Sequence, residues 1–272
     1  GSSFELIRIR GPRSEETIMT ALEIKGMKIG EGLPKTIISL MDPTVEETIE
    51  TIKAGIEVGV DAFEWRGDFA ADLHDPAQMA TNSKLIAAAT PNNPLLFTMR
   101  TIEAGGQATL PVDEYVALNK AIIEAGAIDM VDIDIELGEE SPMELVAFAK
   151  EHQVATVISY HNFRGTPSVE WMVDLMCRMH NLGADIPKIA TMALCPEDTL
   201  RLLQATYEVS KLHHDGPLLT MAMGRDGSLS RLTGEMYGSS LTFCALKAAS
   251  APGQVDVRQA KRIMQELHEV IS

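Results

Sequence analysis

Cysteine is scarce in this sequence, and its cysteines form no familiar pattern. Only Cys177, Cys195 and Cys244 occur in 272 residues, far apart and without a Cys-x-x-Cys spacing. An odd number of widely spaced cysteines argues against a disulfide framework and against a structural zinc site. We therefore expect reduced thiols and a cytoplasmic location.

Basic residues are also in short supply. Lysine and arginine total 23 against 39 aspartates and glutamates, which gives a net charge of −16. A negative field of this size repels nucleic acids and anionic membranes, so neither is an expected partner. A small anionic substrate stays compatible with this charge, because a few local arginines can override it.

Long apolar runs are missing as well. We find no stretch long enough to cross a bilayer and no basic-plus-apolar signal peptide. Hydrophobic residues nevertheless make up 45% of the chain, which is ample for a large buried core. Residues 1–3, Gly-Ser-Ser, are interpreted as a cloning remnant, and residues 4–272 are predicted to form a single barrel domain.

Short β-rich apolar runs alternate with longer helical patterns, which is typical of βαβ units around a parallel sheet. We predict strands at Thr36–Met41, Ala62–Arg66, Leu95–Arg100, Met130–Ile135, Ala155–His161, Lys188–Met192, Leu218–Met223 and Ser240–Ala245. Helices are predicted at Thr44–Val58, Val112–Ala125, Met143–His152, Ser168–Leu182, Pro196–Val209, Leu232–Gly238 and Gln254–Ile271.

Eight strand–helix units in a chain of this length predict an α/β fold, a closed (β/α)8 TIM barrel. The alternative is an open doubly wound sheet, which usually has a glycine-rich phosphate turn after its first strand. Here the first strand is followed by Asp42-Pro43-Thr44, a helix start without glycine. Ahead of that strand, Phe4–Arg8 and Ala21–Lys28 are predicted to pair as an N-terminal β-hairpin that closes the barrel floor.

Catalytic groups of a barrel project from the carboxyl ends of its strands, and unusual polar residues stand there in this sequence. Glu64, Arg66 and Asp68 alternate after the second strand, so they share a face while the chain stays extended. They could form a buried ion-pair layer, bind substrate, or do both. For Arg100, at the end of the third strand, an ion pair with Glu64 or Asp68 is slightly favoured over substrate contact.

The fourth strand carries a row of carboxylates, Asp132, Asp134 and Glu136, that alternates with apolar residues. Such a row could ligate a hard cation. Because no histidine or further carboxylate converges on it in the sequence, we expect no metal.

Lys188 lies in an otherwise apolar β run, where lysine is rarely buried without a reason. The structural alternative is a salt bridge to Glu64 or Asp132. The functional alternative is an amine whose pKa is lowered by desolvation and nearby positive charge until it can attack a carbonyl. His161 ends the fifth strand, which suits a general acid–base. The other six histidines are expected at the solvated surface: His74, His152, His180, His213, His214 and His268.

Further candidates follow the last two strands. Arg231 offers a forked donor suited to a carboxylate or a phosphate. Ser250 and Gln254, four apart around a Pro-Gly turn, could add donors to the same anion. Met221 and Met223 share a face of the seventh strand and would otherwise be core fillers.

Together, these segments resemble the type I 3-dehydroquinate dehydratase family over nearly the whole chain from Lys35 onward. The matching stretches occur in the family's order and spacing, and they are Ile38-Ser39-Leu40-Met41, Glu64-Trp65-Arg66 with Asp68, Phe97-Thr98-Met99-Arg100, Ser159-Tyr160-His161-Asn162-Phe163, Lys188-Ile189-Ala190, Met221-Ala222-Met223-Gly224, Gly227-Ser228-Leu229-Ser230-Arg231 and Ala249-Ser250-Ala251-Pro252-Gly253-Gln254. The resemblance implies a lyase that converts 3-dehydroquinate to 3-dehydroshikimate, the third step of the shikimate pathway, without metal or cofactor.

By that resemblance, Lys188 would form an imine with the C3 ketone. His161 would remove the C2 proton and protonate the departing C1 hydroxyl in a syn elimination. The substrate-binding residues would be Ser39, Glu64, Arg66, Arg100, Met221, Met223, Arg231, Ser250 and Gln254, with Gln254 on a lid loop. Asp68 and Glu103 would support them from behind, and the enzyme would be a homodimer.

The sequence departs from the family pattern beside the histidine. Members often carry a glutamate four residues after the arginine of the third strand, where it helps to orient that histidine. Here the position is Ala104, before Gly105-Gly106. We therefore expect His161 to be less tightly oriented than usual, unless Glu103 reaches it from a shifted loop or water and Asp68 serve instead.

Two other functions stay open from the residues. A Schiff-base aldolase acting on a sugar phosphate usually has a glycine-rich phosphate pocket after strands seven and eight, whereas Arg231, Ser250 and Gln254 suit a carboxylate better. A barrel that only senses a ligand would not need to keep both Lys188 and His161.

Overall fold

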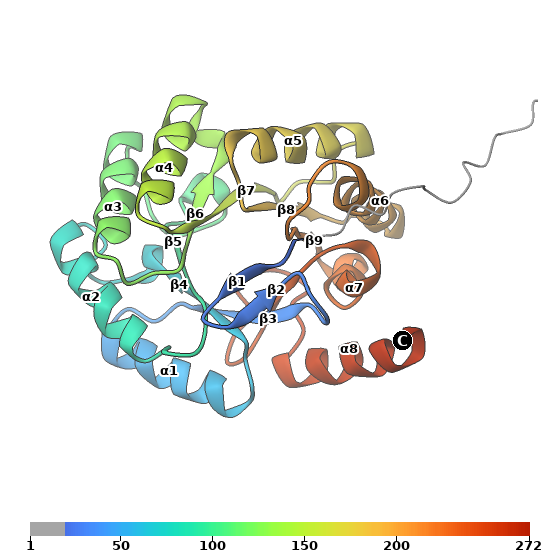
Figure 1. The fold of residues 1–272 in the computed structure, drawn as a ribbon, viewed down its shortest axis with the longest axis horizontal. Helices are drawn as coiled ribbons and strands as arrows, with labels where there is room; N and C mark the ends of the chain where they lie inside the picture. The colour runs from blue at the N-terminus through green and yellow to red at the C-terminus, as the bar shows by residue number, and fades with distance from the viewer. Residues whose placement is uncertain (1–19) are drawn as a thin grey trace, which may run out of the picture.

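Within residues 20–272, which the computed structural model describes, eight parallel strands form a nearly closed barrel surrounded by helices (Figure 1). The strands are β3 (Lys35–Leu40), β4 (Ala62–Arg66), β5 (Leu95–Thr98), β6 (Met130–Asp134), β7 (Ala155–Asn162), β8 (Ile186–Met192), β9 (Leu219–Met223) and β10 (Leu241–Cys244). They run in chain order around the barrel, with β10 beside β3. Ser240 N donates to Leu218 O at 2.7 Å, which joins the last strand to β9. The predicted (β/α)8 fold is therefore confirmed.

The helices alternate with the strands and cover the outside of the barrel. They are α1 (Val45–Glu57), α2 (Pro76–Ala88), α3 (Val112–Glu124), α4 (Glu140–Glu151), α5 (Val169–Leu182), α6 (Pro196–Leu212), α7 (Gly234–Tyr237) and α8 (Val257–Ile271). Several begin at the hydroxyl or carboxylate that the sequence offers as a cap. Thr44 accepts from Glu47 N and Ser168 accepts from Trp171 N, which satisfies amides that the first turn leaves free.

Sequence patterning missed α2, because its buried face carries no continuous apolar stripe. The residues that it buries are Met79, Asn82, Ser83 and Ile86, of which two are polar. A local signal was present: Asp75 caps the helix by accepting from Gln78 N, and Pro76 occupies the first turn.

An N-terminal hairpin is present as predicted, but the segment expected to be one of its strands folds into a hairpin by itself. β1 (Leu22–Ile24) and β2 (Met27–Ile29) pair antiparallel within the segment that we expected to act as one strand. Lys25 and Gly26 have φ of 51° and 77°, the left-handed values of a two-residue hairpin turn, so this segment folds back on itself. The expected partner, Phe4–Arg8, lies outside the described residues.

The hairpin does cover one end of the barrel (Figure 1). Ile29 is buried in the apolar cluster inside the barrel, and Leu22 and Ile24 pack against it. Lys25 Nζ donates to the carbonyls of Thr90 and Asn93, which precede β5. The covered end is therefore the amino-terminal end of the strands, and the carboxyl end is left for the polar residues.

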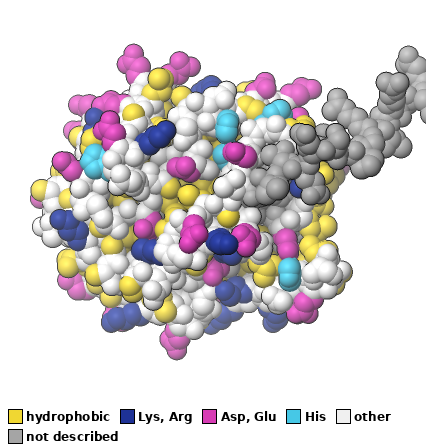
Figure 2. All heavy atoms as spheres, viewed as in Figure 1, with side chains coloured by type: hydrophobic (Ala, Val, Ile, Leu, Met, Phe, Trp, Pro, Cys, Tyr) yellow, Lys and Arg dark blue, Asp and Glu magenta, His cyan; other side chains and the backbone are white. Residues whose placement is uncertain are grey.

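Two apolar layers hold the barrel together. The larger one lies between the sheet and the helices and includes Trp65, Phe97 and Tyr115. The smaller one fills the barrel near the hairpin and includes Ile37 and Leu96. On the hairpin side the surface mixes acidic and basic side chains (Figure 2). Each helix of residues 20–272 is too short or too polar to cross a membrane.

Candidate active site

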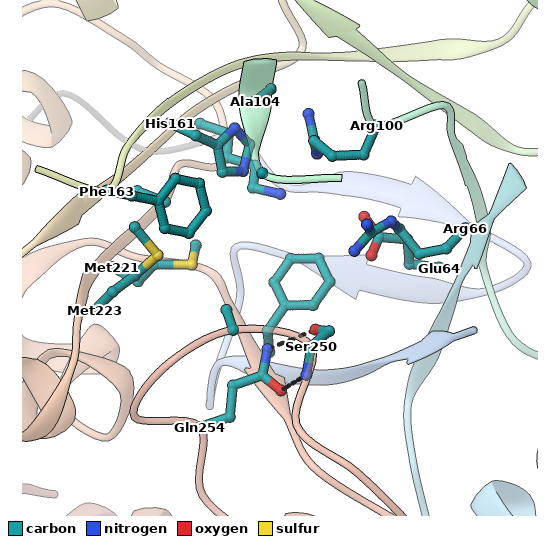
Figure 3. Close-up of a pocket in the computed structure, with 15 residues that line it drawn as sticks. Glu64, Arg66, Arg100, Ala104, His161, Phe163, Met221, Met223, Ser250 and Gln254 are labelled. Atoms are coloured by element: carbon teal, nitrogen blue, oxygen red, sulfur yellow. Dashed lines mark hydrogen bonds between the residues drawn. The ribbon is translucent and has the colours of Figure 1, made fainter. Parts of the chain in front are cut away.

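A narrow pocket opens at the carboxyl ends of the barrel strands (Figure 3). Its lining comes from β4, β7, β8, β9, β10 and the loops that follow β5, β7 and β10, and consists of Glu64, Arg66, Arg100, Ala104, Gly105, His161, Phe163, Lys188, Ala190, Met221, Met223, Phe243, Ser250, Ala251 and Gln254. The fold thus brings together every residue predicted to be catalytic or to bind substrate except Ser39 and Arg231. Those two lie just behind the pocket lining, as described below.

Lys188 projects from β8 into the pocket and is 3% exposed. Its Nζ lies 3.9 Å from Oδ2 of Asp132 and 4.6 Å from the centre of the Phe243 ring. Burial and the charge of Arg100 lower the pKa of Lys188 to about 8, although Asp132 opposes this shift. Lys188 therefore lies near an interior carboxylate, and its lowered pKa is compatible with the predicted nucleophilic role, which stays a prediction.

Asp132 is engaged mainly by Arg100 and only weakly by Lys188. Arg100 Nη1 and Nη2 donate to the two carboxylate oxygens of Asp132 at 3.0 Å each, and Ser159 Oγ donates at 2.7 Å. Burial opposes ionisation, yet Arg100 and Lys188 hold the pKa of Asp132 below its usual range. The predicted pairing of Arg100 with Glu64 or Asp68 was wrong, because β6 lies next to β5 and presents Asp132 to this arginine.

Arg66 and Asp68 form a pair of their own. Arg66 Nε and Nη2 donate to the carboxylate of Asp68 at 2.8 Å each, a bidentate geometry that fixes the guanidinium plane. Asp68 also accepts from Gln107 N at 2.9 Å, which anchors the loop after β5. Glu64, Arg66 and Asp68 were expected to share one face of an extended strand. The chain leaves the strand at Gly67, so Asp68 turns back toward Arg66.

Glu64 belongs to a separate network of hydroxyl groups. Its carboxylate accepts from Ser39 Oγ at 2.7 Å and from Thr98 Oγ1 at 2.8 Å. Ser39 Oγ lies 3.0 Å from Ser250 Oγ, which accepts from Gln254 Nε2 at 2.8 Å. The loop after β10 is thereby connected through Ser39 to the interior of the barrel.

His161 lies at the end of β7 and its ring stacks near Phe163 at an interplanar angle of 13°. Its Nδ1 is buried and finds no hydrogen-bond partner among residues 20–272. Burial and the positive charges of Arg100 and Lys188 hold the pKa of His161 well below its usual range. The imidazole is therefore neutral at physiological pH and can accept a proton.

The loop beside His161 brings no carboxylate to its ring. Ala104 is buried and faces the ring (Figure 3), whereas Glu103 is exposed and lies outside the lining of the pocket. The predicted support of His161 by Glu103 is therefore not found. Gly105 has φ of 86°, and a Cβ there would lie 2.3 Å from the Phe163 ring, so the loop needs a glycine at this point.

Arg231 lies under the loop after β10 and is 2% exposed. Its Nη2 donates to Pro252 O at 2.9 Å, while its buried Nε and Nη1 have no partner within the described part of the chain. Burial lowers the pKa of Arg231 to about 10. Buried donors without partners are costly, so the free Nε and Nη1 mark Arg231 as a candidate anion-binding residue.

The lid, which we define as residues 246–254, folds over the pocket. Gly224 N donates to Pro252 O at 3.1 Å, and Ser250 N donates to Gln254 Oε1 at 2.9 Å. Gly253 has φ of 82° and approaches Gly224 closely, since a Cβ there would lie 2.5 Å from Gly224 O. Ser250 and Gln254 reach the pocket from the side opposite His161 and Arg100 (Figure 3).

The carboxylate row of β6 does not form a cation site. Asp132 is engaged by Arg100, and Asp134 accepts from Glu136 N where the chain turns out of the strand. That turn leaves Glu136 exposed, so the alternation ends at Asp134.

One of the histidines expected at the surface is instead buried. His214 is 6% exposed, and its Nδ1 lies 2.8 Å from Nδ1 of His180. Sequence reasoning missed it because His214 follows α6 directly and looked like part of a polar loop.

A polar pocket at the carboxyl ends of the strands, with a buried lysine and a neutral imidazole, defines the class of this protein as a (β/α)8 barrel enzyme. The family model of type I 3-dehydroquinase matches residues 36–271, and the chain belongs to that family. It is therefore a dehydratase, a lyase.

Curated and solved relatives agree with this assignment. The chain is 39% identical over 251 residues to the 3-dehydroquinate dehydratase of Escherichia coli O1:K1 / APEC, covering 92% of this chain and 100% of that protein. The type I 3-dehydroquinate dehydratase from Clostridium difficile has a TM-score of 0.88 and 37% identity, covering 92% of this chain and 98% of that one. The 3-dehydroquinate dehydratase from Geobacillus kaustophilus HTA426 has a TM-score of 0.90 and 31% identity, covering 95% and 100%.

Proposed function

We propose that this enzyme dehydrates 3-dehydroquinate to 3-dehydroshikimate, the third step of the shikimate pathway, through an imine on Lys188. The observation that carries the mechanism is a buried lysine with a pKa of about 8 in the same pocket as a neutral histidine. At pH 7 roughly a tenth of an amine with this pKa is neutral. With the ordinary pKa of 10.5, the neutral fraction would be less than about a thousandth. The solved Clostridium difficile relative holds covalent modified comenic acid, which fits a covalent step in this family.

The first half of the reaction makes the C2 proton acidic. The neutral amine of Lys188 adds to the C3 carbonyl, and loss of water from the adduct leaves a cationic iminium. Neutral His161 then takes the C2 proton, the electron pair of that bond forms a C2–C3 double bond, and the iminium π electrons move to nitrogen to give an enamine. Arg100 stays paired with Asp132 and contributes to the positive field that lowers the pKa of Lys188.

The second half expels the C1 hydroxyl. Protonated His161 gives its proton to that hydroxyl, which leaves as water while the enamine electrons form the C1–C2 double bond. Water then hydrolyses the conjugated iminium, which releases the product ketone and the Lys188 amine. The overall change is the loss of one water. Because His161 serves both proton transfers, the proton and the hydroxyl leave from the same face, which makes the elimination syn.

Substrate orientation follows from the charges of the pocket. The unpartnered donors of Arg231 would bind the substrate carboxylate, with Ser250 and Gln254 completing that end from the lid. Glu64, Arg66 and Arg100 would bind hydroxyl groups, and Met221 and Met223 would pack against the ring. Ser39 would act by holding Glu64 and Ser250, and Asp68 by holding Arg66. The set of Arg231, Ser250 and Gln254 suits a carboxylate better than a sugar phosphate.

The decisive experiment is borohydride reduction in the presence of 3-dehydroquinate, followed by peptide mass analysis. We expect an adduct on the peptide that contains Lys188 and none in Lys188→Met. His161→Gln should still be trapped as an adduct, while its turnover falls by roughly 10²–10⁴-fold. Absence of an adduct, or an adduct on another lysine, would refute the imine mechanism.

We further propose that the enzyme acts in the cytoplasm as a homodimer. The cytoplasmic location is supported by three free cysteines, Cys177, Cys195 and Cys244, none of which is paired in residues 20–272. The homodimer rests on the family resemblance. Light scattering on the purified chain should give twice the mass of one chain, and the mass of a single chain would contradict the dimer.

A further inference from the structure

A second group of ligating side chains lies at the opposite end of the barrel from the pocket. His180 occupies the last turn of α5, and His214 and Asp215 follow α6. One ligating atom from each of these three residues lies within 4.8 Å of the other two. The neighbouring segments, around Asp185 and Pro217, lead into β8 and β9 at their amino ends. The group therefore has no part in the chemistry at Lys188.

The hydrogen bonds of His214 determine which nitrogen is free to bind. Its Nε2 lies 3.2 Å from both Asp185 O and Pro217 O, two carbonyls that can only accept, so Nε2 carries the proton. Nδ1 therefore presents its lone pair toward His180. A histidine that donates one ring N–H to a backbone carbonyl and turns the other nitrogen outward has the arrangement usual for a metal ligand.

The two imidazoles meet through their Nδ1 atoms. The contact of 2.8 Å between the two Nδ1 atoms leaves room for a single proton, which belongs to His180 in the metal-free pair. Asp215 is exposed beside the pair and supplies a carboxylate oxygen.

We propose that His180, His214 and Asp215 form a binding site for a divalent transition metal ion, with zinc as the best fit. Two imidazoles and one carboxylate are the ligand types that zinc takes, and solvent would complete the tetrahedron on the exposed side. Two nitrogens on zinc lie roughly 3.3 Å apart, given Zn–N bonds of about 2.0–2.1 Å at tetrahedral angles. The pair must therefore open by about half an ångström, which the half-buried His180 can do at the end of its helix while His214 stays fixed.

Bound zinc would tie the end of α5 to the segment between α6 and β9. An ion that binds the folded chain alone shifts the unfolding equilibrium toward that state.

The test is calorimetric titration of zinc chloride into the untagged full chain. We expect one zinc per chain and a melting temperature raised by roughly 5 °C or more at saturating zinc. His180→Gln and Asp215→Asn, which alter side chains that are not fully buried, should each weaken zinc binding at least roughly tenfold. Both variants should keep the turnover of the parent enzyme.

The matched control is His213→Gln. His213 is adjacent to the site but is exposed, and its ring lies 3.9 Å from Glu208 instead. This variant should bind zinc as the parent does. The proposal fails if the parent does not bind zinc, or if His180→Gln binds as tightly as the parent. It also fails if His213→Gln loses as much affinity as His180→Gln, or if zinc binding is lost in His161→Gln, which would place the ion in the pocket.

Discussion

At the level of single residues, the ammonium group of Lys188 has only a distant carboxylate partner. Asp132 is the nearest carboxylate, yet its two oxygens are used by Arg100 at 3.0 Å each, so its distance from Lys188 is 3.9 Å. A tighter pair would hold the amine protonated and unable to attack a carbonyl. We therefore expect the strong bond to Arg100 to keep Lys188 available for the proposed attack on a carbonyl.

The pH dependence of activity should follow Lys188. Its folded pKa is about 8, below the ordinary 10.5, so the inactive ammonium form dominates below pH 8 and the amine above it. The pKa of His161 is already lowered well below 6.5, so its neutral form persists across this range. We expect kcat/KM to rise roughly tenfold from pH 6.5 to pH 7.5 and to level off above pH 8. A pH profile that is flat from 6 to 9 would contradict this assignment.

Because Ala104 has no carboxylate, we expect His161 to be less well oriented than it would be with a glutamate at this position. We expect Ala104→Glu to place a carboxylate against the ring and to raise the pKa of His161. We also expect kcat to increase by roughly an order of magnitude. Loss of the carboxylate that orients a catalytic histidine in other enzymes lowers kcat by more than this. The measurement is kcat together with the acid limb of the pH profile.

The control for this change is Glu103→Ala, which should leave kcat unaltered because Glu103 is exposed. If Ala104→Glu changes neither kcat nor the acid limb, then packing alone already orients His161.

At the level of elements, the lid is held to the barrel by a few contacts at its base and at its tip. Ala245 N donates to Val255 O and Val257 N donates to Ala245 O, each at 2.9 Å, which fastens the base of the lid. Pro252 O at the tip accepts from Gly224 N and from Arg231. The lid thus contacts the same guanidinium that we expect to bind the substrate carboxylate, so we expect lid closure and substrate binding to be coupled.

Gly253→Ala tests that coupling. A Cβ would lie 2.5 Å from Gly224 O on a residue with φ of 82°, so the tip of the lid must move. We expect kcat/KM to fall at least roughly tenfold while the melting temperature changes by only a few degrees, because the lid adds little to the core. The matched control is Gly138→Ala, whose φ is 93° with no atom of the described chain within 4 Å, and which should keep full activity. Equal losses of activity in both variants would count against a role for the lid.

At the level of the whole molecule, the net charge of −16 opposes an anionic substrate that the pocket attracts locally. Salt screens exposed charges over a Debye length of roughly 10 Å at 0.1 M, while a buried group such as Arg231 is screened much less. We therefore expect kcat/KM to rise modestly as sodium chloride goes from about 10 mM to about 300 mM. A steep fall over that range would show that exposed cations, and not Arg231, dominate substrate attraction.

Much of the site could be predicted because barrel topology converts positions in the sequence into positions in space. Lys188, His161 and Met221 follow the strand rhythm, and strands of a barrel present their carboxyl ends at one rim. The partner of Arg100 could not be predicted in this way, since it depends on which neighbouring strand presents a carboxylate at the same depth. The turn at Lys25 and Gly26, which makes a hairpin of the segment that follows Thr20, was likewise not indicated by strand periodicity.

The sequence by itself determined the fold, the family resemblance, and the lysine and histidine of the pocket, because periodicity and strand ends are local properties of the chain. Only the tertiary structure decided how the charges are shared. The tertiary structure pairs Asp132 with Arg100 and buries His214 against His180. It also leaves Nδ1 of His161 and two donors of Arg231 without a partner in residues 20–272. These outcomes depend on distances between side chains far apart in the sequence and on the removal of water around them, and no local pattern encodes either.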